Sequence, residues 1–352
     1  MTLIAPNAGI RVTVPYNLPI YEGEIVMLKK VILAIVGLLA LGTAFFFFRF
    51  TVLLPRDIPI PDLTVPTSAA EIERGRYLAN HVAVCMDCHS TRNWDYYAGP
   101  IVDGTLGQGG EVFDQSTGLP GVIIAKNITP HALGDWSDGE LYRAITGGLQ
   151  ADGDALFPLM PYDAYRTMAL EDVLAIMAYL RTLEPIENAT PDHQLDFPLS
   201  LIVNAIPLEA EPRAVNRDDD SLEGKVAYGD YLAKMAGCTW CHSPVNATQQ
   251  AIPEQLLAGG HEFVLPDGSV VRATNISSDL DTGIGSWTEE QFIGAFRYYQ
   301  GEGSRWIPVD EGGSNTLMSW TLFADMTDAD LAAIYAYLIA SEPRNNKVVV
   351  WD

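Results

Sequence analysis

The chain has 352 residues, with 45 acidic side chains against 21 Lys and Arg and a formal net charge of −24. This charge argues against nucleic acid as a partner and would attract a protein with a basic surface, although a merely soluble acidic surface explains it equally well. The length leaves room for two domains of ordinary size.

An apolar run occupies residues 31–48, and beyond Arg49 further apolar residues prolong it to residue 54. This run is long enough to span a bilayer. Lys29 and Lys30 precede it and no convincing small-x-small cleavage site follows, which favours a retained transmembrane anchor over residues 31–54. Residues 1–30 form a leader, in which the signal-like start at Met27 indicates that residues 1–26 come from a mis-assigned translation start.

Residues 55–66 are rich in proline and predict an extended stalk that keeps the first domain off the membrane. Ser68 and Glu71 then match a capping box that opens a helix. This helix leads to the sequence Cys85-Met-Asp-Cys88-His89.

A second run of the same form follows as Cys238-Thr-Trp-Cys241-His242. Cys-x-x-Cys-His is the attachment signature of a covalently bound haem c. The two thiols form thioethers with the porphyrin, and the adjacent histidine is the proximal iron ligand. A redox dithiol, a four-cysteine zinc site and two disulfides explain less, because a zinc ribbon needs closely spaced cysteine pairs and none of the three needs both histidines. We therefore predict two covalently bound haem c groups.

The surroundings of the two motifs also repeat, which indicates duplication of one mostly helical module. Gly75 and Gly229 correspond, and we expect two helices to cross closely at each. The other matched pairs are Tyr77 with Tyr231, 109–113 with 259–263, 127–129 with 275–277, Trp136 with Trp287, Met160 with Met318, Met168 with Met326, and Asp172 with Asp330.

Each repeated tryptophan precedes a second capping box, Ser137-x-x-Glu140 after Trp136 and Thr288-x-x-Gln291 after Trp287. Trp136 and Trp287 are candidate contacts to the haem or its propionates, and an ordinary core position is an equal alternative.

A low-spin electron-transfer haem needs a sixth ligand, and a methionine thioether raises its reduction potential. Met160 and Met318 are the candidates, since each lies in a loop ahead of the last helix of its module. Met168 and Met326 start that helix and are expected to be buried packing residues. Pro161 stiffens the first ligand loop, whereas Ser319 does not stiffen the second.

The other histidines do not match between the two copies, so a shared bis-histidine scheme is not predicted. His81 is expected to be a surface or packing residue. The remaining three are His131, His193 and His261.

The predicted fold is mostly α, with two tandem cytochrome c domains behind an N-terminal transmembrane helix. The predicted boundaries are 67–184 for the first domain, 185–222 for a linker that wraps the domain surfaces, 223–345 for the second domain and 346–352 for a tail. Covalent haem attachment takes place outside the bacterial cytoplasm, so we expect a single-pass protein of the inner membrane with its haem domains on the periplasmic side.

The sequence resembles the dihaem class I cytochromes c, including cytochrome subunits that accept electrons from membrane-bound alcohol and sugar dehydrogenases. The likeness covers residues 67–345 and rests on the two Cys-x-x-Cys-His motifs and on stretches 127–130 (Asn-Ile-Thr-Pro), 134–136 (Gly-Asp-Trp) and 156–162 (Leu-Phe-Pro-Leu-Met-Pro-Tyr). The resemblance implies a helical cytochrome c fold in each half, with His89/Met160 and His242/Met318 as axial pairs. Two departures are that those subunits commonly carry three haems and that Ser319-Trp320 replaces Pro-Tyr after Met318.

The leading hypothesis is an electron carrier or electron-accepting subunit that works with a dehydrogenase, a respiratory complex or another redox protein. The alternative is an enzyme, such as a dihaem peroxidase or a thiosulfate-oxidising cytochrome, with an open or weakly ligated second haem; Glu262 and Asp310 would be its acid/base candidates, although their spacing does not single them out. A haem-based sensor would need an output domain, for which no segment is large enough.

Overall fold

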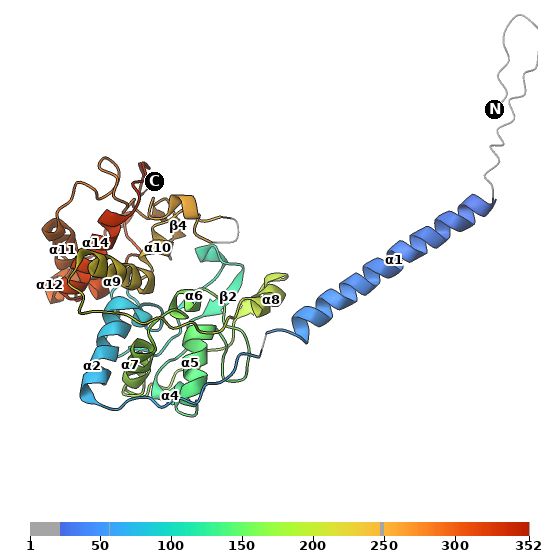
Figure 1. Ribbon diagram of the computed structural model, residues 1–352, viewed down its shortest axis with the longest axis horizontal. Helices are drawn as coiled ribbons and strands as arrows, with labels where there is room; N and C mark the ends of the chain where they lie inside the picture. The colour runs from blue at the N-terminus through green and yellow to red at the C-terminus, as the bar shows by residue number, and fades with distance from the viewer. Residues whose placement is uncertain (1–21, 56, 247–249, 352) are drawn as a thin grey trace, which may run out of the picture. The chain divides into compact units, whose positions relative to one another are not determined.

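The computed structural model describes residues 22–55, 57–246 and 250–351. The chain divides by its contacts into two compact units, Met1–Leu53 and Leu54–Asp352 (Figure 1). Most of the leader expected over residues 1–30, with its mis-assigned start over 1–26, lies outside the described residues and stays a prediction.

The first unit contains helix α1 (Glu22–Thr51). Its stretch Ile25–Thr51 has a mean hydropathy of 2.6 and is not buried against the protein, and among the described residues it is the one helix long and apolar enough to cross a membrane. The helix begins well before the predicted apolar run, because most of the residues ahead of it are also good helix formers. A signal sequence has the same length and composition, so the retained anchor stays a prediction.

The second unit consists mostly of helices that follow the same order in its two halves (Figure 1). The first half contains α2 (Ala69–Tyr77), the π-helix η1 (Leu78–Val82), α3 (Cys85–Cys88), α4 (Pro130–Leu133), α5 (Asp138–Gly147), α6 (Tyr162–Tyr165) and α7 (Leu170–Leu180). The second half contains α9 (Leu222–Met235), α10 (Cys238–Cys241), α11 (Glu289–Arg297), α12 (Glu302–Arg305), α13 (Trp320–Phe323) and α14 (Asp328–Ala340). The mostly helical fold class is confirmed.

Two small antiparallel sheets complete the unit. One has the strand order β1 (Val112–Phe113), β2 (Gly121–Ile124), β3 (Gln194–Leu195), and the other pairs β4 (Glu262–Val264) with β5 (Val270–Arg272).

Strand β3 belongs to the predicted linker, and its Leu195 lies opposite Gly121 of β2. Short turns of helix follow in the linker as α8 (Leu199–Ile202) and η3 (Val203–Ala205), and two more 3-10 turns are η2 (Gln115–Thr117) and η4 (Pro253–Gln255). The linker therefore lies along the surface of the first half.

The stretch predicted as a stalk is extended, but residues 57–66 are not a free spacer. Ile58 and Val65 are buried. The backbone N–H of Val65 donates to the carboxylate of Asp138 at 2.9 Å, and the guanidinium of Arg143 donates to the carbonyl of Ile58. This packing follows from the apolar residues that alternate with the prolines, because they bury surface against α5.

Side-chain caps define the starts of the principal helices. The capping boxes predicted at Ser137 and Thr288 are both confirmed. At Ser68 the hydroxyl accepts from the N–H of Glu71, but it also donates to the Glu71 carboxylate at 2.5 Å, so the cap forms without the reciprocal backbone bond. Sequence analysis missed the caps at Ser221 and Thr327, which start α9 and α14.

The two expected close helix crossings are confirmed. A Cβ atom placed on Gly75 in α2 would lie 1.7 Å from the carbonyl oxygen of Ala175 in α7. A Cβ atom on Gly229 in α9 would lie 1.9 Å from the carbonyl oxygen of Ala333 in α14. Only glycine allows backbones to approach so closely, so each half is built around one crossing of its first and last long helices.

Matched residues of the repeat join the two halves to each other. The hydroxyl of Tyr77 donates to Asp330 at 2.6 Å, and the hydroxyl of Tyr231 donates to Asp172 at 2.7 Å. Both carboxylates are buried. Buried residues of both halves also form one continuous apolar core. The duplicated modules therefore meet in a reciprocal, pseudo-twofold arrangement.

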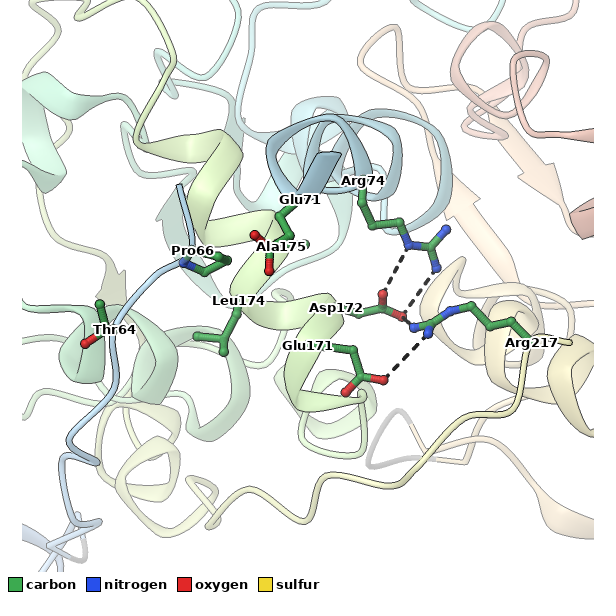
Figure 2. A pocket seen from close by; sticks show the side chains of 9 residues that line it. All are labelled: Thr64, Pro66, Glu71, Arg74, Glu171, Asp172, Leu174, Ala175 and Arg217. Atoms are coloured by element: carbon green, nitrogen blue, oxygen red, sulfur yellow. Dashed lines mark hydrogen bonds and ion pairs between the residues drawn. The ribbon is translucent and has the colours of Figure 1, made fainter. Parts of the chain in front are cut away.

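The linker joins this contact through Arg217 (Figure 2). Its guanidinium lies 2.7 Å from the Asp172 carboxylate, which also accepts from Arg74 of α2 at 3.2 Å. Arg217 reaches Glu171 at 3.6 Å as well. Because a buried carboxylate is costly without partners, these cations fix the linker against α2 and α7.

We expect Gly75→Ala to destabilise the folded protein by at least about 2 kcal/mol, because the new methyl group would overlap a backbone carbonyl that has no rotamer to adopt. The measurement is the midpoint of urea unfolding. Gly294→Ala in α11 is the matched control, since nothing lies within 4 Å of the position that its methyl group would take. The control should raise stability by roughly 0.5–1 kcal/mol through helix propensity. Equal effects of the two substitutions would contradict the close crossing.

Candidate haem-binding sites

Both Cys-x-x-Cys-His motifs form a single helical turn with the same geometry. The cysteines begin and end α3 and α10, so their thiols lie three residues apart on one face of the turn. The residue ahead of each turn is left-handed, Val84 at φ 43° and Gly237 at φ 73°. Glycine adopts this conformation freely, whereas valine is strained there. The residue ahead of each motif therefore has the same left-handed backbone conformation, although valine disfavours that conformation.

The histidine that ends each motif is oriented by a backbone carbonyl. Nδ1 of His89 lies 2.6 Å from the carbonyl oxygen of Lys126, and Nδ1 of His242 lies 2.8 Å from that of Thr274. A carbonyl only accepts, so Nδ1 carries the proton and Nε2 keeps its lone pair for a metal. Burial lowers the pKa of both imidazoles, which favours the neutral, ligating form.

The repeated Asn-Ile-Thr and Asn-Ile-Ser landmarks hold these carbonyls in place. They directly follow Lys126 and Thr274, and the side chains of Asn127 and Asn275 are buried. The amide oxygen of Asn127 accepts from the N–H of Thr129 at 2.9 Å, and that of Asn275 accepts from Ser277 at the same distance. The sequence identified these stretches as landmarks, and their contacts explain why both copies contain them.

The backbone turns at the two candidate methionines are identical in form. The N–H of Tyr162 donates to the carbonyl of Met160 at 2.7 Å, and the N–H of Trp320 donates to that of Met318 at 2.7 Å. The central residues have φ −79° and ψ 53° at Pro161, and φ −76° and ψ 53° at Ser319. Both are inverse γ-turns. Serine therefore takes the conformation that proline imposes in the other copy.

The exposure of the methionines separates two roles. Met160 and Met318 are partly exposed and pack against the edge of the apolar core. Met168 and Met326 are 1% and 2% exposed and lie within the apolar core. This burial agrees with the packing role expected for the second pair.

The two repeated tryptophans lie in different surroundings. Trp136 packs against the apolar core, and its carbonyl accepts from Arg181 at 2.6 Å. Trp287 is 41% exposed, and its carbonyl accepts from the hydroxyl of Tyr335 at 2.6 Å. Their candidate contact to a haem stays a prediction.

The unmatched histidines are dispersed. Nδ1 of His81 lies 2.9 Å from the carbonyl of Leu322, a packing contact between the halves. His261 is 5% exposed and contacts the carbonyl of Trp240 at 3.3 Å. His131 is exposed and His193 is half-buried in the linker. A contact between Nδ1 and a backbone carbonyl thus does not by itself identify an iron ligand. The adjacent cysteines are what distinguish His89 and His242.

The four cysteines, all in the described part of the chain, are unpaired thiols. No group of three or more His, Cys, Asp and Glu among the described residues could hold a metal ion by itself. The thiols on one turn and the free Nε2 of the adjacent histidine fit a haem held by two thioethers. The acid/base candidates of the enzyme alternative do not converge on a site, since Glu262 pairs with Arg272 at 2.7 Å and Asp310 is exposed.

Similar proteins are cytochrome c subunits. The fructose dehydrogenase cytochrome subunit of Gluconobacter japonicus is 31% identical over 293 residues, which are 78% of this chain and 54% of that protein. The gluconate 2-dehydrogenase cytochrome c subunit of Pantoea cypripedii is 28% identical over 292 residues, 76% of this chain and 59% of that protein. A protein named diheme cytochrome c-type, from Cereibacter sphaeroides, is 28% identical over 62% of this chain and 71% of its own length.

The chain spans little more than half the length of the first two relatives. No protein-family model matches the chain. The similarity to cytochrome c subunits of dehydrogenases, expected from the motifs, is confirmed.

His261 should make stability depend on pH. Burial lowers its pKa, so below its ordinary value of about 6.5 the unfolded chain binds a proton that the folded chain does not. Stability from this group is therefore present above that pH and is lost as pH falls, by at most about 1.4 kcal/mol per pH unit. We expect His261→Gln to lose less stability than the unmodified protein between pH 7.5 and 5.5, measured by urea unfolding.

The exposed His131 supplies the control for this measurement, because His131→Gln changes the same chemistry without burial. An equal flattening of the pH dependence in both variants would contradict the effect of burial at His261.

Proposed function

We propose that this relative of the dehydrogenase cytochrome c subunits is a membrane-anchored cytochrome with two covalently bound haem c groups. It would pass single electrons from a donor dehydrogenase or quinol-oxidising complex to a downstream acceptor. The observation that carries this proposal is the duplicated geometry: two Cys-x-x-Cys turns, each with a histidine whose Nε2 is free, and two identical methionine turns. Duplication of a whole site is hard to explain by packing alone.

Each half would hold its haem with its own residues. Cys85 and Cys88 would form the thioethers of the first site, and His89 and Met160 would hold its iron. Cys238 and Cys241 attach the second haem, with His242 and Met318 as its ligands. A bound haem supplies an iron that takes up and releases one electron.

The protein would then act by tuning and shielding these irons. With a histidine and a methionine on each iron, no position would remain open for a substrate, so the protein would conduct electrons and not transform a substrate. The carbonyls of Lys126 and Thr274 would increase the electron density on the imidazoles by accepting hydrogen bonds from their Nδ1–H groups. A thioether on the opposite face favours the ferrous state and raises the potential.

The partners follow from the relatives and from charge. The relatives are subunits of fructose and gluconate dehydrogenases, which supports a dehydrogenase as electron donor. The net charge of −24 supports a second partner with a basic surface, whose approach it would speed at low ionic strength.

Helix α1 supports attachment to the inner membrane through residues 31–54. Because haem c is attached outside the cytoplasm, both haem domains, 67–184 and 223–345, would lie on the periplasmic side. The linker 185–222 joins the domains within one compact unit.

The first test is haem content. The purified full chain should contain two haems per polypeptide that survive acid-acetone extraction, measured as the pyridine haemochrome. The double variant Cys238→Ser/Cys241→Ser should retain only one, because the first motif does not depend on those thiols. A metal analysis that finds zinc with no covalent haem would overturn the proposal.

The second test is the optical spectrum of the ferric and ferrous protein with a redox titration. Two low-spin haems with the methionine-to-iron charge-transfer band in the ferric form support the carrier, and both should titrate as one-electron centres. A high-spin component with rapid peroxide turnover would instead support the enzyme alternative, with an open second haem.

A further inference from the structure

The segment that carries Met318 is held by the first half of the protein. The N–H of Tyr97 donates to the carbonyl of Ile307 at 2.8 Å, and the N–H of Val309 donates to that of Asp95 at 2.9 Å. These bonds join the loop after the first cysteine motif to the loop ahead of the second methionine. The second methionine loop thus pairs, in the manner of a β-strand, with a segment of the first half. That segment lies earlier in the sequence by more than half the length of the unit.

Asn315 is the centre of this contact. It lies three residues before Met318 and is 6% exposed. Its amide oxygen accepts from the N–H of Ala98 at 2.8 Å, and its amide nitrogen donates to the carbonyls of Trp94 and Tyr96 at 3.3 Å each. The side chain of Asn315 therefore pairs with one backbone donor and two backbone acceptors of the opposite half. This requires both the oxygen and the nitrogen of its amide.

The contact continues toward the methionine turn. The amide oxygen of Asn315 also accepts from the N–H of Thr316, whose hydroxyl accepts from the N–H of Met318 at 3.1 Å. Ser319 is buried, and while burial raises the pKa of the Asp87 carboxyl in the first cysteine motif, Ser319 contributes to holding that pKa down, which places the two side chains near each other. Two short links thus connect the first half to the backbone on either side of Met318.

Among the residues that the structure describes, the first methionine loop has no comparable arrangement. Phe157 stands three residues before Met160 and cannot form an amide contact. Proline at 161 fixes φ of that turn by its own ring, whereas serine at 319 leaves φ free. The same turn is therefore stabilised covalently in one half and by contacts from the other half in the second.

We propose that Asn315 is a positioning residue for Met318, through which the loop 94–98 of the first half fixes the second methionine turn. The inference rests on the proposed function, because it takes Met318 to be an iron ligand. It predicts that ligation of the second haem depends on the first half of the chain, while ligation of the first haem does not depend on the second in this way.

The test uses the full chain with both haems. Asn315→Asp keeps the shape of the side chain but replaces the donating nitrogen with an oxygen that faces two carbonyls. We expect it to lose up to half of the ferric methionine-to-iron band, as one haem of two loses its thioether, and to lower the potential of that haem alone. Asn315→Ala, which removes the amide without adding charge, is measured as well, in case the aspartate prevents assembly.

Ser319→Pro provides a rescue. The backbone nitrogen of Ser319 donates to no described residue, and its φ of −76° already suits a proline ring. Combined with Asn315→Asp, it should restore the band, because proline fixes the turn without help from the first half. A purely structural role of Asn315 predicts no such recovery, so failure of the rescue would overturn the inference.

Two further variants separate the possible failures. Met318→Leu defines the share of the band that belongs to the second haem; an unchanged spectrum there would overturn the ligand assignment in the proposed function. A band that halves in Met318→Leu but persists in Asn315→Asp and Asn315→Ala would overturn only the positioning role. Asn346→Asp makes the same charge change at an amide that donates to Ala258 within the second half, and it should leave the band intact.

Discussion

Two buried carboxylates, Asp172 and Asp330, determine how the halves of the globular unit meet. Each accepts a hydrogen bond from a tyrosine of the opposite half, and Asp172 also faces Arg74 and Arg217. A buried charge without partners costs several kcal/mol, so the halves cannot separate or slide without losing these contacts. The two halves therefore belong to one compact unit, and the linker arginine belongs to the same contact.

This constraint brings functional segments of one half against the other. The tyrosines lie on the helices that lead into the two cysteine motifs, and the aspartates lie on the helices that follow the two methionine loops. Joining them also joins the loop 94–98 to the loop that carries Asn315. The duplication is symmetric at the tyrosine–aspartate pairs but asymmetric at the methionine turns, since Asn315 ahead of the second turn bonds the opposite half and Phe157 ahead of the first cannot form such a bond.

The sequence was a reliable guide at several positions where one residue type has one local use. Glycine at 75 and 229 predicted close crossings, and Ser137 and Thr288 predicted capping boxes; the structure confirms all four. It was a poorer guide where apolar residues lie between prolines. The stretch predicted as an extended stalk is extended, but it also packs against the first half, because its isoleucine and valine side chains are buried there.

By itself, the sequence determined the local chemistry: which cysteines share a helical turn, which histidine follows them, and which methionine stands in each loop. These relations depend on neighbours three or four residues apart, which a sequence states directly. Only the tertiary structure decided which carbonyl orients each imidazole, that matched tyrosines and aspartates pair between halves, and that Asn315 reaches Ala98. Those contacts join residues far apart in the chain, and their geometry exists only once the two halves have packed together.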